Sequence, residues 1–278
     1  MRKIKIVADS ACDFFALKDT EFTCASMKII TDEREFVDNT SLDVDGMVDF
    51  LYQYKGKSSS SCPNTSDWID AFGDADDVFC VTITSGLSGS YNSACLAKQI
   101  YESENEGKRV HVFDTLSAGP EITLIIEKIE ECVKSGMSYE DVCVNVEEYM
   151  KKTGLVFMLK SLKNLANNGR VSPIVAKLAG IAGICIVGKV SNEGTLEPMH
   201  KCRGEQRSLK TLVEAIEAEG FRSGKISIGH CQNESAANQL KELILAKFEN
   251  VQIEIHKLKG LCSYYAEKGG VLAGFEKA

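Results

Sequence analysis

The chain has 278 residues, which is enough for one large domain or two of ordinary size. Hydrophobic residues make up 44% of it and charged residues 26%, as is ordinary for a soluble globular protein. The formal net charge is -8 and there is no basic stretch, which argues against nucleic acid as the main partner.

The cysteines and the apolar runs predict a cytoplasmic protein. The 11 cysteines are scattered, none is spaced as CxxC, and no Cys/His cluster has the spacing of zinc ligands. We therefore expect reduced, mostly buried thiols, no metal site and no cofactor. Residues 1–5 run straight into a strand without a signal-peptide core. No apolar run reaches the ~20 residues of a membrane helix, so no integral membrane segment is expected.

A short apolar strand is predicted at residues 4–8, and the polar pair Asp9-Ser10 follows it at once. Polar residues in this place suit the mouth of an α/β sheet, but either residue could equally be an ordinary helix cap. A second strand is expected over residues 22–30. Apolar residues at helical spacing then predict a helix over residues 43–54.

Residues 55–67 are predicted to form a polar loop that contacts a ligand. The loop contains four consecutive serines at 58–61, followed by Cys62 and Pro63. A flexible linker is the alternative, but Pro63 stiffens the segment and a helix follows from Trp68. Hydroxyl-rich loops between two α/β elements commonly carry function.

Residues 82–91, Thr-Ile-Thr-Ser-Gly-Leu-Ser-Gly-Ser-Tyr, join a buried strand predicted at 78–84 to a helix predicted at 89–101. A strand-to-helix turn of this kind leaves free backbone N–H groups at the start of the helix. These groups, the helix dipole and the serine hydroxyls together suit an anion. The alternative is that Ser88 or Ser90 simply caps its own helix.

The pattern of strand, polar turn and helix occurs a third time, with a strand at 110–113 and a polar turn at 114–120. Three such units predict a mainly parallel sheet covered by helices. A capping-box pattern at 138–141 begins a further helix, which extends to about residue 153. The first α/β domain is therefore assigned to residues 1–154.

A second α/β domain is predicted over residues 155–278. Small apolar residues at 176–183 leave room either for close helix packing or for an apolar ligand. The expected elements are a strand at 155–159, a short helix closed by an amide-rich turn at 164–170, a helix opened by Ser172 and Pro173, a hairpin of strands at 184–190 and 195–200, a helix from 203 to 218, a strand–helix–strand unit at 225–230, 236–248 and 251–256, and a glycine-edged strand or turn at 269–274.

Taken in order, these motifs resemble those of the DegV family over nearly the whole chain. The turn at 85–91 is the most specific piece, and the ordered set is much stronger than any one motif. The matching segments are Asp9-Ser10, Ser60-Ser61-Cys62-Pro63 for the family's Thr-Ser-Gln-Pro, residues 85–91 for its Ser-Gly-Leu-Ser-Gly-Thr-Tyr, residues 114–119 for its Asp-Ser/Thr…Ser-x-Gly, residues 168–172 for its Gly-Gly-Arg-Ile-Ser, and residues 201–204 for its Arg-x-Arg-Gly.

The resemblance implies two α/β domains with a long-chain fatty acid buried between them, its acyl tail among apolar residues of the C-terminal domain. It implies that Ser60 and Ser88 hold the carboxylate, and hydroxyl and N–H donors do suit this charge. Some family members deliver their fatty acid to a separate kinase that makes acyl phosphate, so the chain is expected to be a carrier and not an enzyme, with a fatty-acid kinase as a possible partner. The expected ligand-binding residues are Ser60, Ser61, Ser85, Ser88, Gly89 and Arg170.

The chain departs from the family pattern in several places. Ser60 replaces Thr, Cys62 replaces Gln, and residues 184–185 are Ile-Cys where the family usually has Lys-Pro. The family's His, two residues before a Gly-Pro-Gly, has no counterpart in residues 264–270. Because that His lies near the ligand head in the family, its absence bears on transfer to a kinase more than on lipid binding.

Two other classes of function remain open from the residues alone. One is a small-molecule hydrolase or transferase that uses Cys62 or Ser88 as its nucleophile. Such an enzyme needs a base within hydrogen-bond reach, and the sequence pairs no histidine with either residue. The other is a sugar- or phosphate-binding α/β protein that uses the same turns. The lipid content of the purified protein separates these classes from a fatty-acid carrier.

Overall fold

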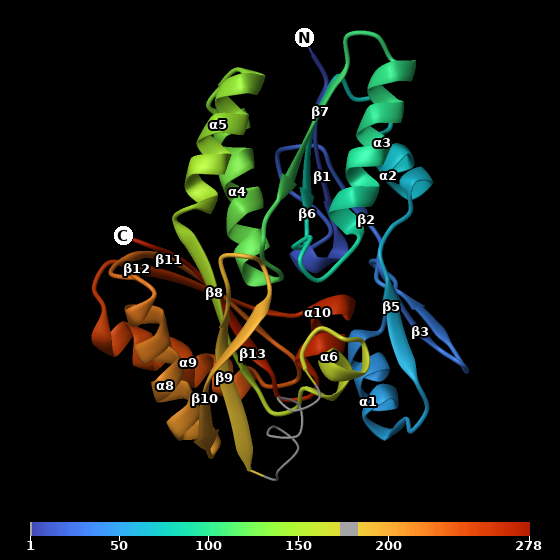
Figure 1. Cartoon of the computed structure of the whole chain (residues 1–278). Coiled ribbons are helices and arrows are strands. Elements are labelled where there is room, and N and C mark those ends of the chain that lie inside the picture. The colour runs from blue at the N-terminus through green and yellow to red at the C-terminus, as the bar shows by residue number, and fades with distance from the viewer. Residues whose placement is uncertain (1, 173–182) are drawn as a thin grey trace.

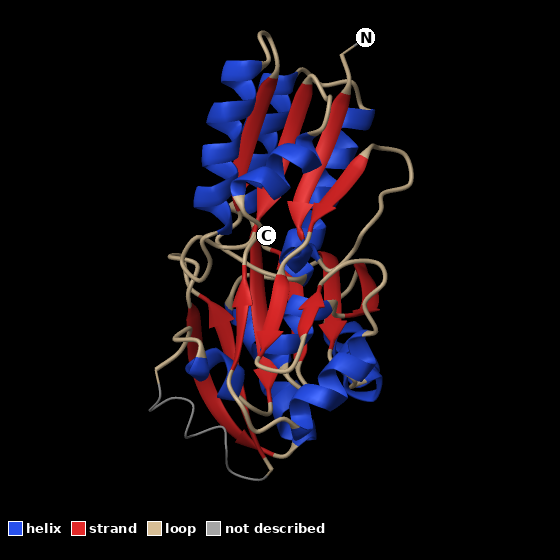
Figure 2. Cartoon of the chain, turned by 90° about the vertical axis from the view of Figure 1, so that its right-hand side faces the viewer, coloured by secondary structure: helices blue, strands red, loops and turns tan. Residues whose placement is uncertain are grey.

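The structure is a computed structural model of the chain, and it describes residues 2–172 and 183–278. The strands of these residues form three sheets, and the two larger sheets lie one above the other (Figures 1 and 2). The predicted helix that begins at Ser172 and Pro173, and most of the small apolar stretch 176–183, lie outside the described residues.

The N-terminal sheet is parallel throughout, which confirms the prediction from the repeated strand–turn–helix units. Its order is β2 (Phe22–Ala25), β1 (Ile4–Asp9), β6 (Asp77–Thr82), β7 (Arg109–Asp114). Helices α2 (Thr65–Phe72) and α3 (Ser90–Glu104) cover one face, and α4 (Pro120–Lys134) and α5 (Tyr139–Met150) cover the other. Alternate strand residues serve the two layers: Val7 and Cys80 share a buried cluster with α2 and α3, and Ile6 and Phe79 share one with α4 and α5.

The prediction of a single strand over residues 22–30 is wrong, because the chain passes from one sheet to another within this segment. After Ala25 it leaves the parallel sheet, and the Met27 N–H donates to the Ser10 hydroxyl at 3.1 Å. The polar loop predicted at 55–67 is also partly wrong, since it contains a strand and the start of α2. The small antiparallel sheet has the order β4 (Glu35–Val37), β3 (Lys28–Thr31), β5 (Ser58–Ser61), and α1 (Val44–Gln53) follows β4.

The C-terminal sheet mixes strand directions and has helices α8 (Glu205–Ala218) and α9 (Glu234–Lys247) on one face. The hairpin predicted from two neighbouring strands is confirmed in β9 and β10. The glycine-edged tail is β13, a central strand. Its Gly274 is required because a Cβ there would lie 2.4 Å from the backbone nitrogen of Glu121 in α4. The order is β10 (Leu196–Arg203), β9 (Ile184–Val190), β8 (Thr153–Leu159), β13 (Val271–Glu276), β11 (Gly224–His230), β12 (Val251–Lys257).

The small sheet and α1 pack on the C-terminal half of the chain, although they precede it in sequence. Figure 1 shows α1, β3 and β5 beside α6 (Lys163–Asn167) and α10 (Gly260–Ala266). Asp38 fastens this packing, because its carboxylate accepts the N–H groups of Gly260 and Leu261, both at 2.8 Å. The division into domains at residues 1–154 and 155–278 therefore stays a prediction.

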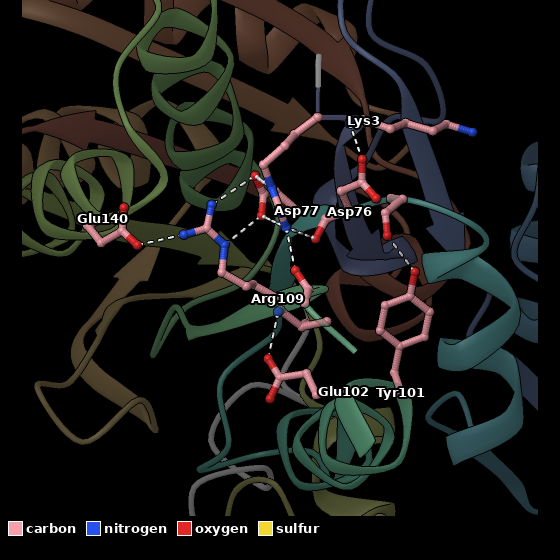
Figure 3. Close-up of polar contacts among 11 residues, drawn as sticks. Lys3, Asp76, Asp77, Tyr101, Glu102, Arg109 and Glu140 are labelled. Atoms are coloured by element: carbon pink, nitrogen blue, oxygen red, sulfur yellow. Dashed lines mark hydrogen bonds and ion pairs between the residues drawn. The ribbon is translucent and has the colours of Figure 1, made fainter. Parts of the chain in front are cut away.

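An ion-pair network holds the amino ends of the parallel strands together (Figure 3). The carboxylate of Asp77 is nearly buried and accepts from Arg109 Nε at 2.7 Å and from Arg2 Nε at 2.8 Å. Burial by itself would raise the pKa of Asp77, but the two guanidinium groups outweigh it and hold that pKa below its usual value. Arg109 also pairs with Glu140 at 2.6 Å. The carboxyl ends of the same strands carry a different set of polar groups.

Candidate functional site

The carboxyl ends of β1 and β6 are joined through the side chain of Asp9. This carboxylate accepts the Ile83 N–H at 2.9 Å and the Ser90 hydroxyl at 2.6 Å. It also accepts the Ala11 N–H at 3.2 Å. Asp9 therefore both caps a short helical turn and links the residues that follow the two strands. Burial raises the pKa of Asp9 to about 6, against the hydrogen bonds, which lower it.

The turn between β6 and α3 has little capping of its own. The N-cap residue of α3 is Gly89, which has no side chain to cap the helix. Ser90 is not a cap, because its hydroxyl donates to Asp9. Ser88 Oγ accepts the Ser90 N–H at 3.3 Å, which is a long and weak local bond. Ser85 is exposed, and its N–H donates to Asp114 Oδ1 at 3.0 Å, so this residue supports the loop.

The tip of the β9–β10 hairpin lies over the same turn. The Thr84 hydroxyl donates to the carbonyl oxygen of Gly194 at 2.8 Å. A Cβ on Gly86 would lie 2.8 Å from the carbonyl oxygen of Glu193, so only glycine allows this approach. The turn is thus enclosed by the two halves of the chain.

Strand β5 and helix α10 bring further hydroxyl groups toward this turn. Ser60 Oγ lies 2.7 Å from the Tyr265 hydroxyl oxygen, and Ser58 Oγ lies 2.9 Å from that of Tyr264. Asn168 Nδ2 also donates to the Tyr264 hydroxyl at 2.9 Å. Sequence reasoning assigned no role to either tyrosine, because only the fold places α10 beside β5.

These elements surround a cavity of about 280 Å³. Its polar members contact one another, since Gly89 lies against Cys62 and Ser60 bonds to Tyr265. The cavity therefore has one polar cluster in an otherwise apolar wall. The polar cluster consists of Ser60, Ser61, Cys62, Ser88, Gly89, Arg170 and Tyr265, and the apolar lining of Met27, Ile83, Leu87, Ala118, Leu155, Phe157, Leu159, Leu165, Leu196, Leu261, Cys262, Ala266 and Leu272.

Arg170 is the only charged residue among the described residues that line the cavity. Its Nε donates to the carbonyl oxygen of Leu87 at 3.1 Å, and its Nη1 donates to that of Asn168. Its guanidinium carbon lies 6.0 Å from the ring centroid of Tyr265. A fixed cation and several hydroxyl groups, with no carboxylate in the described lining, suit an anionic ligand head.

Five of the six residues predicted to bind a ligand line this cavity, and Ser85 is not among the lining residues. The apolar wall from β8 was missed. Leu155, Phe157 and Leu159 alternate toward the cavity, while Val156 and Met158 face α8 and α9. Because residues 155–159 are all apolar, the sequence does not reveal this alternation.

The environment of Cys62 does not favour a nucleophilic thiolate. Burial raises the pKa of its thiol, which keeps it protonated near neutral pH. No histidine is among the described lining residues, so the polar cluster offers Cys62 and Ser88 no imidazole as a general base. These observations weigh against the hydrolase or transferase class.

We expect Cys62→Ser to leave ligand affinity nearly unchanged, because the substitution keeps the shape of the side chain and removes only the thiol chemistry. The measurement is a binding titration beside an ester-hydrolysis assay for both proteins. A hydrolytic activity that is present in the wild type and lost in the variant would restore the enzyme class.

The sequence from residue 3 to residue 276 matches the family model "Uncharacterised protein, DegV family". The chain belongs to the DegV family. It is 40% identical to a DegV domain-containing protein of Streptococcus gordonii over 276 residues, which are 98% of each chain. The resemblance drawn from the motifs is confirmed.

Solved structures of similar proteins agree in fold. A DegV family protein of Eubacterium eligens loaded with heptadecanoic acid has a TM-score of 0.97 and 40% identity, covering 99% of this chain and 100% of its own. The Streptococcus pneumoniae fatty acid kinase (Fak) B3 protein loaded with linoleic acid has a TM-score of 0.96 and 39% identity, covering 99% of each chain. These proteins bind fatty acids, as a non-enzymatic carrier would.

Three further features concern the described residues as a whole. Residues 2–172 and 183–278 contain no group of three or more His, Cys, Asp or Glu side chains that could hold a metal ion. Within the same ranges, no helix is both long enough and apolar enough to cross a membrane. All 11 cysteines have free thiols.

Proposed function

We propose that this DegV protein binds one long-chain fatty acid in the 280 Å³ cavity and acts as a carrier, not as an enzyme. One observation carries the proposal: the described lining is apolar except for a single cluster that contains a cation and no carboxylate. The two similar proteins loaded with heptadecanoic and linoleic acids support it.

The carboxylate is assigned to the polar cluster. Ser60 and Ser88 supply hydroxyl donors and Gly89 supplies a backbone N–H, with Ser61 and the cation of Arg170 alongside. A hydrogen bond to a charged group contributes roughly 1.5–3 kcal/mol. Two or three such bonds would fix the head group and favour a charged head over an uncharged one.

The tail must supply much of the affinity. Burying about fourteen methylenes at ~0.8 kcal/mol each stabilises the complex by roughly 11 kcal/mol before costs. Association costs about 4–15 kcal/mol in lost freedom, so the carboxylate alone would not bind tightly. The apolar walls from β8, α10 and β13 are suited to this burial. A sugar- or phosphate-binding protein would have little use for them.

We expect the protein purified from a bacterial host to carry close to one fatty acid per chain. A ligand buried in an apolar cavity dissociates slowly and survives purification. The measurement is native mass spectrometry, followed by extraction and identification of the acid. Protein that stays free of lipid even after incubation with palmitate or oleate would contradict the proposal.

We also propose that the bound acid is presented to a separate fatty-acid kinase in the cytoplasm, where ATP is available. The relative named for fatty acid kinase, at 39% identity, supports this role. The test is acyl phosphate formation by a purified kinase from protein-bound acid and from free acid. Equal rates from protein-bound and free acid would exclude a role in presenting the acid to the kinase. Finding the protein outside the cell would exclude the cytoplasmic location.

A further inference from the structure

A second cavity, of about 480 Å³, lies between α4 and the outer strands β11 and β12. None of the described residues that line it also lines the apolar cavity. Its walls carry four carboxylates and two ammonium groups. We call it the acidic groove, lined by Glu127, Glu130, Glu131, Lys134, Lys225, Ser227 and Glu254 together with nearby apolar atoms.

The ammonium groups of the acidic groove are already engaged. Lys225 Nζ lies 3.3 Å from Glu127 Oε2, and Lys134 Nζ lies 2.7 Å from Asp19 Oδ2. In the described part of the chain, Glu130 and Glu254 have no ion-pair partner within 4 Å. Two carboxylates of the groove therefore have no ion-pair partner in the described part of the chain, although the charge of Glu130 still acts on Lys134.

The electrostatics of Glu127 agree with this excess of negative charge. Burial raises the pKa of Glu127, and Lys225 opposes that rise. The neighbouring carboxylates Glu254 and Glu130 raise it further. A cation that enters the groove would relieve this repulsion.

Ser227 supplies an independent sign of a ligand. It lines the groove, is only 3% exposed, and its Oγ has no hydrogen-bond partner among the described residues. It stands opposite Glu254 in the register of β11 and β12. Glu130 Oε1 is buried and unpartnered in the same way. Buried polar atoms without partners are rare and costly, and an N–H donor in the groove would satisfy both.

We infer that the acidic groove binds a linear aliphatic polyamine, with ammonium groups on Glu130 and Glu254 and an N–H directed at Ser227. The described residues hold no group of three or more His, Cys, Asp or Glu side chains that could hold a metal ion, which favours an extended polycation over a single ion. Glu127 and Glu130 are three residues apart on α4, a spacing of about 5–6 Å between Cβ atoms, similar to that of amines joined by three or four methylenes. The side chain of Leu124 offers apolar surface to those methylenes.

The test is isothermal titration calorimetry of the full chain with spermidine at low and high salt. We expect saturable binding by the wild type, and a loss of about tenfold or more in the double variant Glu130→Gln, Glu254→Gln. The matched control, Glu214→Gln with Glu242→Gln, removes two exposed carboxylates from α8 and α9, on the other face of the sheet. It should bind spermidine like the wild type.

Ser227→Ala separates a ligand role from a structural one. We expect it to weaken spermidine binding while the melting temperature of the free protein is unchanged or higher, because the hydroxyl has no partner to lose.

An equal loss of spermidine binding in the control double variant would show unspecific attraction and overturn the inference. So would groove-dependent binding of Mg²⁺ or of a lysine-rich peptide in place of spermidine, which would indicate a metal site or a protein-docking surface.

Discussion

Ser88→Ala should weaken the binding of palmitate about tenfold to a hundredfold and leave hexadecanol binding nearly unchanged. A hydroxyl that donates to a carboxylate contributes roughly 1.5–3 kcal/mol, and 1.4 kcal/mol is about one decade of affinity. The alcohol has the same tail and no charge, so it lacks the part of the interaction that Ser88 strengthens. The measurement is the ratio of acid to alcohol affinity in the wild type and in the variant.

Ser85→Ala is the matched control on the same turn. Ser85 contributes its backbone N–H to Asp114, which alanine retains, so both ligands should bind the variant as they bind the wild type. The competing explanation is that Ser88 acts only through its bond to the Ser90 N–H. Losing a cap costs about 1 kcal/mol of stability and would weaken acid and alcohol alike. In that case the carboxylate lies elsewhere in the polar cluster, with Arg170 the next candidate.

The parallel sheet could be predicted because its signals are local. Each strand, its polar turn and the helix after it are contiguous in sequence, and the connection rules then fix the topology. The turn at 82–91 shows the same advantage, since the glycines and hydroxyls that form the site are neighbours along the chain. Ser88 and Gly89 were found in this way, and they do line the cavity.

Features that depend on distant partners could not be predicted. Residues 22–30 look like one strand, and only the edge offered by β5 explains why the chain divides between two sheets. Tyr265 lines the cavity because α10 packs beside β5, more than two hundred residues away in sequence. The tail at 269–274 contains three glycines, a composition typical of a turn, yet it forms most of a central strand because α4 packs against Gly274.

The roles of the buried carboxylates beneath the site could be predicted only in part. Asp9 was predicted as a cap or as a group at the sheet mouth, and the structure gives it both roles. Nothing in the sequence distinguishes Asp13 or Asp38 from exposed acids, yet both are nearly buried beside the start of α10. Their environment leads to a prediction about pH.

Asp13→Asn should stabilise the protein at pH 8 and flatten the fall in its stability between pH 6.5 and pH 8. Asp13 Oδ1 accepts the Lys259 N–H at 2.7 Å, and Oδ2 has no hydrogen-bond partner in the described residues. Burial raises the pKa of Asp13 from 3.8 to about 8; the charge of Asp38 adds to this, while Lys259 opposes it. Asparagine keeps the acceptor and carries no charge to bury. It also tolerates the left-handed backbone at this position, where φ is 64°.

The direction in which stability changes with pH follows from proton binding. Between pH 3.8 and about 8 the folded Asp13 holds a proton that the unfolded chain has lost, so stability falls as pH rises, by about 1.4 kcal/mol per pH unit. Below pH 6.5 His111, His230 and His256, whose pKa values burial lowers, act in the opposite direction. Above about pH 7.5 the unfolded thiols, whose usual pKa is about 8.5, begin to ionise and also lower the stability. These groups are common to the wild type and to Asp13→Asn, so the difference between the two proteins isolates the carboxyl, which should cost the wild type about 2 kcal/mol between pH 6.5 and pH 8.

Urea unfolding at several pH values across this interval measures the slope. The control is Asp70→Asn, which removes an exposed carboxylate at the end of α2 and should leave the slope of the wild type intact. Asp13→Asn should be at least about 2 kcal/mol more stable than the wild type at pH 8, because the unfolded wild type gains much from ionising Asp13 and the folded one gains little. An unchanged slope in Asp13→Asn would mean that Asp13 is ionised in the folded protein, held by the Lys259 N–H at the start of the helix that carries Tyr265.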